Sequence, residues 1–432
     1  MVSRVLVLSL IGILLIGCIQ TDQQNISKPI NTDKPPNDKN ITGENTTIEE
    51  QNNRTSADYS SQPINSTIEK TVIASYYAWY SNKDLTWAVP KPGSPLADHP
   101  LMGSYLSNDP KLIDYELSLA HDSGVDAFGW EWYDPGSALD ILLNETMNKI
   151  DSSTHYPDFK LVLVYSGAAA GGTTDEKAVE ALTYLITEYG QRRPTLKVGN
   201  RPVIIIYTPQ AKSLDQWESI FAKATQEAGP AIYIAQPDDW GIDIPEYLTV
   251  FDTISPYADK YHTNAELTGY YSEVSNIAKP NGKPLIVSTY GGGSRMTKLG
   301  FDIIRANGSF IIERYELAQE LDADWIQLTS WNEWFESNQV EPSVEYGFEQ
   351  IRYLREANAR FKGTELSSLD GAQLRLDSNR VTNTGTQNLY YINCNGSELI
   401  AYMLRPGGST AVPTCTEVSG YLVNDTKIVA GG

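Results

Sequence analysis

Short apolar runs alternate with amphipathic segments through the middle of the chain. Each run is about as long as a β-strand and is rich in Val, Ile and aromatic residues, as expected for strands that are covered on both faces. The predicted strands are residues 71–77, 125–130, 159–165, 202–207, 231–236, 250–255, 284–290 and 325–330. Helices are predicted at residues 109–123, 138–150, 175–189, 213–228, 244–248, 264–278, 309–321 and 345–361.

The order of these segments predicts an α/β fold. Strands and helices alternate, and the first strand is not followed by the Gly-x-Gly-x-x-Gly turn that opens a dinucleotide-binding fold. We therefore predict a (β/α)8 TIM barrel over residues 68–363 rather than a doubly wound sheet.

The N-terminal region has a different composition. Arg4 precedes an apolar run, residues 5–16, that is too short for a comfortable membrane span and is typical of a signal peptide. The run leads into Leu-Ile-Gly-Cys, which resembles a lipobox, so residues 1–18 are expected to be a signal peptide and Cys18 to carry lipid. An uncleaved anchor and an ordinary signal peptide are the alternatives. Residues 19–67 are rich in Asn, Thr, Ser, Gln and Pro and are predicted to be a disordered tether.

The C-terminal residues 364–432 mix apolar and polar positions over short stretches separated by Gly, Pro and Asn. This pattern predicts a small β domain, which could bind sugar or only cap the barrel. With Cys18 lipidated, Cys394 and Cys415 remain as a pair in an oxidising compartment, where a disulfide is expected. Two buried free thiols are the alternative.

The composition narrows the choice of partners. The chain has 432 residues and a formal net charge of -21 without a run of Lys or Arg, which argues against nucleic acid or an anionic membrane surface as a partner. Its 26 Tyr and 9 Trp supply amphipathic rings of the kind that stack on sugars. We expect an exported monomer that is secreted or is held at the outer face of the cell membrane only by its N-terminal lipid. The four His show no metal-ligand spacing, so neither a metal nor a cofactor is expected.

The strongest chemical signal follows the eighth strand, where Glu333 and Glu336 lie among Trp331, Asn332 and Trp334. Barrel enzymes carry their active sites at the C-terminal ends of the strands. Carboxylates beside large aromatic faces at such an end favour an oligosaccharide or polysaccharide cleft, with these two as the acid/base pair. A solvated surface loop is the alternative for an isolated Glu-x-x-Glu.

The other strand ends support a sugar cleft because each carries an aromatic residue within a few positions. The candidate sugar-binding residues are Tyr76, Tyr77, Trp79, Tyr80, His99, Trp130, Glu131, Tyr165, Tyr207, Gln236, Asp238, Tyr257, Tyr290, Trp331, Asn332, Trp334 and Glu341. The fourth and seventh ends, where many retaining glycosidases place their glutamates, carry no carboxylate. The acid/base pair must therefore come from the eighth end, with Glu131 or residues 238–239 assisting.

Several motifs match those of a known family in order along the chain. They are Tyr76-Tyr-Ala-Trp-Tyr80, His99-Pro100 with Gly103-Ser-Tyr105, Arg305-Ala-Asn-Gly308, Thr329-Ser-Trp-Asn-Glu-Trp-Phe-Glu336 and Val340-Glu-Pro-Ser343. Residues 71–362 thereby resemble glycoside hydrolase family 99, the endo-α-mannosidase/endo-α-mannanase family, and the related WbsX-like domains. The resemblance implies a barrel without a metal, retention of the anomeric configuration and a 1,2-anhydro sugar intermediate. It also implies that Glu333 deprotonates the substrate's 2-hydroxyl and that Glu336 is the general acid/base, and aromatic neighbours are expected to desolvate Glu336.

Three departures from the family pattern bear on the substrate. Phe335 stands where the family usually has His, Ser337 where it has Gly, and Glu131 where relatives carry an apolar or aromatic residue. Three hypotheses follow: an endo-acting hydrolase of α-mannoside-type glycans, a cell-surface glycan-binding protein without catalysis, and a WbsX-like polysaccharide-assembly enzyme. Fold alone does not choose among them.

Overall fold

The computed structural model describes residues 67–80, 96, 98–167, 173–238, 240–257, 262–291, 305, 308–396 and 398–431. The predicted signal peptide, Cys18 and all but the last residue of the predicted tether lie outside these ranges. Within them, no helix has both the length and the apolar character that a membrane span needs.

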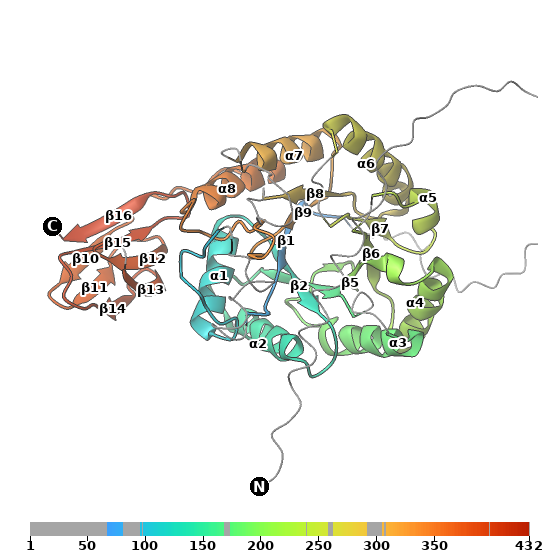
Figure 1. The fold of residues 1–432 in the computed structure, drawn as a ribbon, viewed down its shortest axis with the longest axis horizontal. Helices are drawn as coiled ribbons and strands as arrows, with labels where there is room; N and C mark the ends of the chain where they lie inside the picture. The colour runs from blue at the N-terminus through green and yellow to red at the C-terminus, as the bar shows by residue number, and fades with distance from the viewer. Residues whose placement is uncertain are drawn as a thin grey trace, which may run out of the picture. The chain divides into compact units, whose positions relative to one another are not determined.

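Eight parallel strands form the barrel, as predicted (Figure 1). They are β1 (Thr71–Tyr76), β2 (Ala127–Trp132), β3 (Lys160–Tyr165), β5 (Arg201–Tyr207), β6 (Ile232–Gln236), β7 (Thr253–Ile254), β8 (Ile286–Tyr290) and β9 (Trp325–Thr329). Their order is β7-β6-β5-β3-β2-β1-β9-β8, so the first and last strands of the repeat pair with each other. A hydrogen bond links β7 to the residues just before β8, since the hydroxyl of Thr253 donates to the carbonyl of Pro284 at 2.8 Å. The short β4 (Lys197–Val198), which pairs antiparallel with β5, was not predicted.

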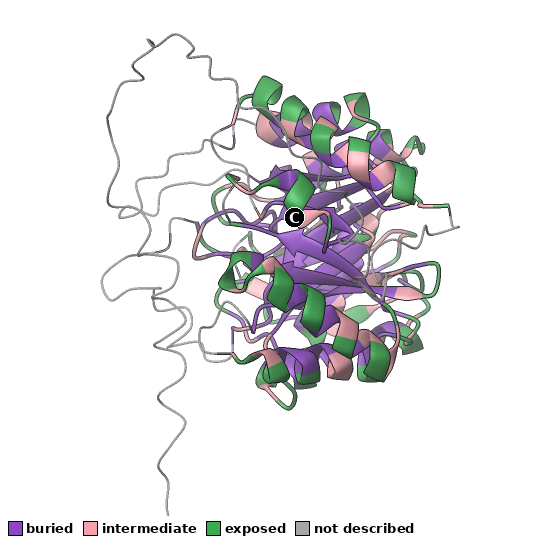
Figure 2. Cartoon of the chain, turned by 90° about the vertical axis from the view of Figure 1, so that its right-hand side faces the viewer, coloured by how far each residue is buried: buried purple, intermediate pink, exposed green. Residues whose placement is uncertain are grey.

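Helices surround the strands, and Figure 2 shows their inner faces buried and their outer faces exposed. They are α1 (Pro110–Asp122), α2 (Ala138–Ser152), α3 (Asp175–Tyr184), α4 (Leu214–Ala228), α5 (Ile244–Tyr247), α6 (Asn264–Ala278), α7 (Ser309–Glu320) and α8 (Glu349–Lys362). The π-helical turn Leu185–Tyr189 extends α3, and short 3-10 turns occupy Pro209–Ala211 and Lys279–Asn281. Local sequence sets several of the starts, because Ser213 and Thr263 form capping boxes at α4 and α6.

Strand alternation decides which side chains reach the inside of the barrel. The inward positions form one core cluster that includes Ile73, Ala127, Val162, Val203, Ile232, Ile286 and Trp325. Residues in the same phase further along each strand face the mouth at its C-terminal end. These are Tyr77, Glu131, Tyr207, Gln236, Tyr257 and Tyr290.

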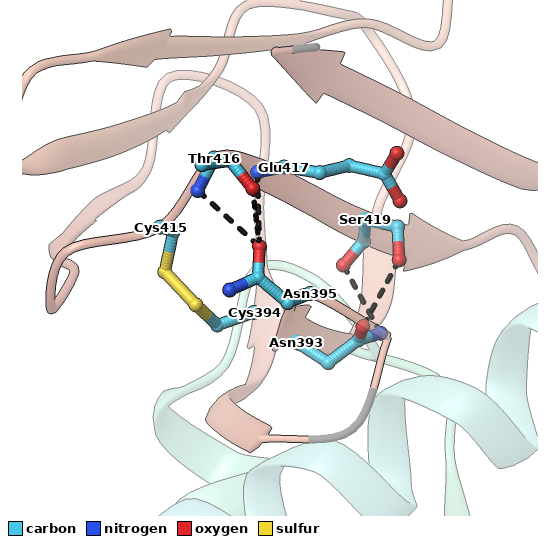
Figure 3. Close-up of a disulfide and its surroundings, with 7 residues drawn as sticks. All are labelled: Asn393, Cys394, Asn395, Cys415, Thr416, Glu417 and Ser419. Atoms are coloured by element: carbon cyan, nitrogen blue, oxygen red, sulfur yellow. Dashed lines mark hydrogen bonds between the residues drawn. A yellow bond between two sulfur atoms is a disulfide. The ribbon is translucent and has the colours of Figure 1, made fainter.

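The C-terminal region folds as two small antiparallel sheets with their own core, which confirms the predicted β structure. Their strands are β10 (Leu374–Asp377), β11 (Arg380–Asn383), β12 (Leu389–Cys394), β13 (Glu398–Leu404), β14 (Ser409–Ala411), β15 (Glu417–Tyr421) and β16 (Lys427–Gly431). Cys394 and Cys415 form the predicted disulfide, with their Cα atoms 5.7 Å apart. Beside it, Asn395 accepts hydrogen bonds from Thr416 and Glu417 (Figure 3).

Charged and aromatic contacts attach this β domain to α1 of the barrel. Arg405, which directly follows β13, binds the carboxylate of Asp114 with two hydrogen bonds of 2.6 and 3.0 Å and also donates to Ser118 at 2.9 Å. Tyr390 donates to Asp122, the last residue of α1. These contacts hold the β domain against α1.

Replacing Arg405 with Gln is expected to lower the free energy of unfolding by about 2 kcal/mol, because the substitution breaks a bidentate, partly buried ion pair. Urea unfolding followed by circular dichroism measures this change. Arg375→Gln is the matched control, since Arg375 pairs with Asp377 on the exposed face of the same domain and should contribute at most about 0.5 kcal/mol. Equal losses in the two variants would contradict the fixed attachment.

Candidate active site

The loop that follows β9, residues 330–341, is fastened to the first strand of the barrel. The backbone N–H of Trp331 donates to the carbonyl of Ser75 at 2.8 Å. The side chain of Asn332 accepts from the N–H of Tyr77 at 2.8 Å and donates to its carbonyl at 3.0 Å. This β9 loop is therefore held at the C-terminal end of the barrel, where active sites of this fold lie.

Glu333 is buried in the β9 loop, with 4% of its surface exposed. Its carboxylate accepts a hydrogen bond from the N–H of Phe335 at 2.9 Å, and its own N–H donates to the hydroxyl of Ser330 at 2.8 Å. Burial raises the pKa of Glu333 well above the ordinary range, and the neighbouring charge of Glu336 raises it further. Among the residues that the structure describes, no Lys or Arg forms an ion pair with Glu333.

Glu336 is half-buried three residues further along. The side-chain amide of Asn338 donates to its carboxylate at 3.1 Å, and the hydroxyl of Ser330 donates to the side chain of Asn338. Ser337 lies between them with φ +55°, a left-handed conformation that glycine adopts without strain. That conformation gives a physical reason for the glycine that the family pattern has at this position.

Both carboxyls lie close enough to three tyrosines to act on them electrostatically. Burial raises the pKa of Tyr77, Tyr257 and Tyr290, and the charges of Glu333 and Glu336 both raise it further. The two glutamates therefore act on the same three tyrosines. From the sequence, Glu336 was expected to be the desolvated carboxyl. The structure instead buries Glu333 more deeply than Glu336.

A third carboxyl, Glu131, faces the same mouth from β2. It is 8% exposed, and burial raises its pKa to about 7. Its charge acts on both Glu333 and Tyr77. The mouth therefore concentrates three carboxyls on the inner side of the barrel.

The raised pKa of Glu131 predicts a pH-dependent stability. A shift from 4.5 to about 7 corresponds to about 3 kcal/mol that favours the protonated folded state. This stabilisation is complete below the unfolded pKa and is lost as the pH rises through about 7. Glu131→Gln stays neutral, so between about pH 4.5 and pH 8 it should gain about 3 kcal/mol in unfolding free energy relative to the wild type. Urea unfolding at both pH values measures this gain, and parallel pH profiles would contradict it.

Aromatic side chains from three strand ends line the mouth. The hydroxyls of Tyr77 and Tyr257 are 2.8 Å apart, and the ring of Tyr207 meets that of Tyr257 edge-on at 5.5 Å. Trp79 stacks on Tyr77 with ring centres 4.4 Å apart and lies 6.4 Å from Phe335. Trp79 and Phe335 are both half-buried, so each keeps part of its surface exposed.

Three predicted sugar contacts face the helices instead of the mouth. Tyr76 donates to Glu116 on α1, Trp130 donates to the carbonyl of Leu139 on α2, and Tyr165 packs against Trp132. These positions are out of phase with the inward residues of their strands. The structure thus corrects their assignment as sugar contacts, since proximity to a strand end does not fix the direction of a side chain.

Other residues predicted to contact sugar instead hold the β9 loop in place. Trp334 donates to Tyr105 and to Glu341, which also accepts from Tyr105 at 2.8 Å. Tyr80 donates to the carbonyl of Asn332 at 2.6 Å, and Trp331 is completely buried. Tyr80, Trp331, Asn332, Trp334 and Glu341 therefore hold the loop rather than line the mouth.

Two predicted contacts are largely exposed. His99 pairs with Glu345 at 2.8 Å, and 58% of its side chain is accessible. Asp238 is exposed after β6, whereas Gln236 before it is buried and in the inward phase. Asp239 lies outside the described residues.

The sequence reasoning missed three residues near the mouth. Tyr133 follows β2 and interacts electrostatically with Glu131 and Glu333. Asp98 and Arg305 form a buried pair beside the β9 loop. The sequence did mark their neighbourhood, because Arg305 begins one of the family motifs and Asp98 directly precedes another. Among the described residues, no group of His, Cys, Asp and Glu could hold a metal ion.

Comparison with known proteins decides the family. The profile of Glycosyl hydrolase family 99 matches residues 93–362, more than half of the chain. The chain belongs to this family. The glycoprotein endo-alpha-1,2-mannosidases of Rattus norvegicus and Mus musculus are each 21% identical to this family 99 hydrolase over 321 and 319 residues. Those matches cover 63% of this chain and 68% and 67% of the two relatives.

Solved structures agree with the barrel fold of the family 99 hydrolase. Two structures of the GH99 endo-alpha-mannosidase from Bacteroides thetaiotaomicron match it with TM-scores of 0.58 and 0.56 at 20% and 21% identity. They cover 69% of this chain and 98% and 99% of their own. The protein is an endo-α-mannosidase-like glycoside hydrolase, and its family implies a glycan substrate.

Proposed function

We propose that the protein is a retaining, endo-acting hydrolase that cleaves α-mannoside-type glycans through a 1,2-anhydro sugar. The observation that carries the proposal is the pair Glu333 and Glu336, three residues apart on one anchored loop and acting on the same three tyrosines. The related rat protein is named an endo-alpha-1,2-mannosidase, which supports the linkage class.

In the proposed first step, Glu333 takes the proton of the 2-hydroxyl, and the resulting oxygen attacks C1. Glu336 gives its proton to the departing glycosidic oxygen, so that the C1–O bond breaks as the three-membered ring closes. In the second step Glu336 takes a proton from water, which attacks C1, and Glu333 returns its proton to the 2-oxygen. A raised pKa makes the Glu333 carboxylate a stronger base toward a weakly acidic hydroxyl, provided that the pH keeps it ionised.

The mouth offers both apolar and polar contacts to a sugar chain. Trp79 and Phe335 present ring faces at its edge, where they can cover the apolar face of a pyranose. Gln236 and Tyr257 offer hydrogen-bonding groups further inside. Because Phe335 replaces a histidine of the family pattern, we expect the subsite next to Glu336 to favour an apolar sugar face over a hydroxyl contact.

The site of action belongs to the proposal as well. The apolar run at residues 5–16 and Cys18 support export and a lipid anchor at the outer face of the cell membrane, with secretion as the alternative. We expect the protein to act as a monomer.

A hydrolysis screen tests the proposed function. Purified protein is incubated with α-mannans and α-mannosyl oligosaccharides, with and without a sugar-phosphate donor, and the products are sized. We expect internal cleavage that needs no donor. Oligosaccharide binding without turnover would instead support a glycan-binding protein, and products that require the donor would support a polysaccharide-assembly enzyme.

A further inference from the structure

A buried arginine connects three segments around the β9 loop. Arg305, which lies between β8 and α7, is 3% exposed. Its guanidinium donates to the carbonyls of Ser337 at 2.8 Å, Gln339 at 2.6 Å and Gly291 at 3.1 Å. It also forms an ion pair with Asp98 at 3.1 Å. One side chain thus holds the end of β8, the segment before α1 and the β9 loop together.

The two β9-loop carbonyls that Arg305 holds flank Asn338. Asn338 is the residue whose side chain donates to the carboxylate of Glu336 at 3.1 Å. Its own carbonyl accepts from the N–H of Ser330 at 3.2 Å, so both the side chain and the backbone of Asn338 are hydrogen-bonded. The packing is close as well, because a Cβ at Gly291 would lie 2.6 Å from the carbonyl oxygen of Asn338.

The ion pair is itself enclosed. Asp98 is 1% exposed and accepts a second hydrogen bond, from the side chain of Gln339 at 2.9 Å. The Arg305 guanidinium also lies over the ring of Tyr346, 5.0 Å from its centre. A planar fork can reach several acceptors in fixed directions, whereas a lysine ammonium offers one point charge. The contacts therefore require arginine in particular.

We infer that the Asp98–Arg305 pair is the positioning unit for Glu336, holding the proposed acid/base in place through the backbone on both sides of Asn338. This inference rests on the proposed role of Glu336. Arg305 acts through Asn338, because it holds the carbonyls on both sides of the residue whose side chain donates to Glu336. A small displacement of an acid that must protonate a departing oxygen is costly, since proton transfer depends on hydrogen-bond distance.

The test compares two substrates that differ in their need for an acid. Cleavage of an α-mannosyl oligosaccharide requires protonation of its leaving oxygen. In the α-fluoride of a mannose disaccharide, by contrast, the fluoride ion departs with little assistance from an acid. For Arg305→Lys and Asp98→Asn we expect kcat on the oligosaccharide to fall about 100-fold, kcat on the fluoride to fall less than about 10-fold, and KM to change little. Asp98→Asn keeps the arginine and serves as the test if Arg305→Lys does not fold.

Arg314→Lys is the matched control. Arg314 is also buried, on α7, but it donates to the side chain of Asn264 and to the carbonyl of His262, which are not part of the β9 loop. Its kcat ratio between the two substrates should equal that of the wild type. Suppose that Glu336→Gln loses much more activity on the oligosaccharide than on the fluoride, the acid-dependent pattern. Equal losses on both substrates in the Asp98 and Arg305 variants, or no loss, would then overturn the inference. If Glu336→Gln itself lacks that pattern, the proposed role of Glu336 fails and the inference falls with it.

Discussion

Glu333→Gln is expected to lower kcat on α-mannosyl oligosaccharides by about 1,000-fold or more, because the amide cannot take the proton of the 2-hydroxyl. The amide oxygen can still accept the hydrogen bond from Phe335, so the β9 loop should keep its shape. Steady-state rates measured by reducing-end formation give the effect.

The control for this variant is Glu356→Gln, which changes an exposed carboxylate on α8 that takes part in an i,i+4 pair with Arg352. It should retain wild-type kcat. The Glu333 variant should also bind the oligosaccharide with nearly wild-type affinity, since only the proton acceptor is lost. Activity of Glu333→Gln within about tenfold of the wild type would remove Glu333 from its assigned role.

Glu336→Gln is expected to lower kcat on the same oligosaccharides by about 1,000-fold, because the departing oxygen no longer receives a proton. The loss should be much smaller on the α-fluoride, whose leaving group needs little protonation. Glu333→Gln, by contrast, should lose activity on both substrates, since both require the 2-oxygen as nucleophile. If Glu333→Gln instead kept its activity on the fluoride and Glu336→Gln lost activity on both substrates, the two roles would be exchanged. The experiment is needed because Glu333 is the more deeply buried carboxyl, and burial favours the protonated form that an acid requires.

The barrel could be predicted from sequence because its strands are short, doubly covered apolar runs separated by amphipathic helices. The position of the proposed pair Glu333 and Glu336 could be predicted for a related reason: charges that follow a buried strand must lie at its end. Both arguments need only local pattern. The same pattern missed the two-residue β4, and β7 occupies only two residues of the predicted strand 250–255.

The direction of the aromatic side chains required more than proximity to a strand end. Tyr76 and Tyr77 are neighbours in sequence, yet one binds Glu116 behind the sheet and the other lines the mouth. Counting the two-residue period from the barrel core would have separated them. The Asp98–Arg305 pair could not be found in this way, because its two residues are 207 positions apart and meet only in the folded chain.

The central claim is that Glu333 and Glu336 together cleave an α-glycosidic bond with retention. A time course by proton NMR of the wild type on α-mannosyl oligosaccharides, beside the double variant Glu333→Gln/Glu336→Gln, measures it most directly. We predict that internal cleavage first releases reducing ends in the α configuration and that the double variant releases none. First products in the β configuration, or a folded wild type that binds these glycans without cutting them, would contradict the account.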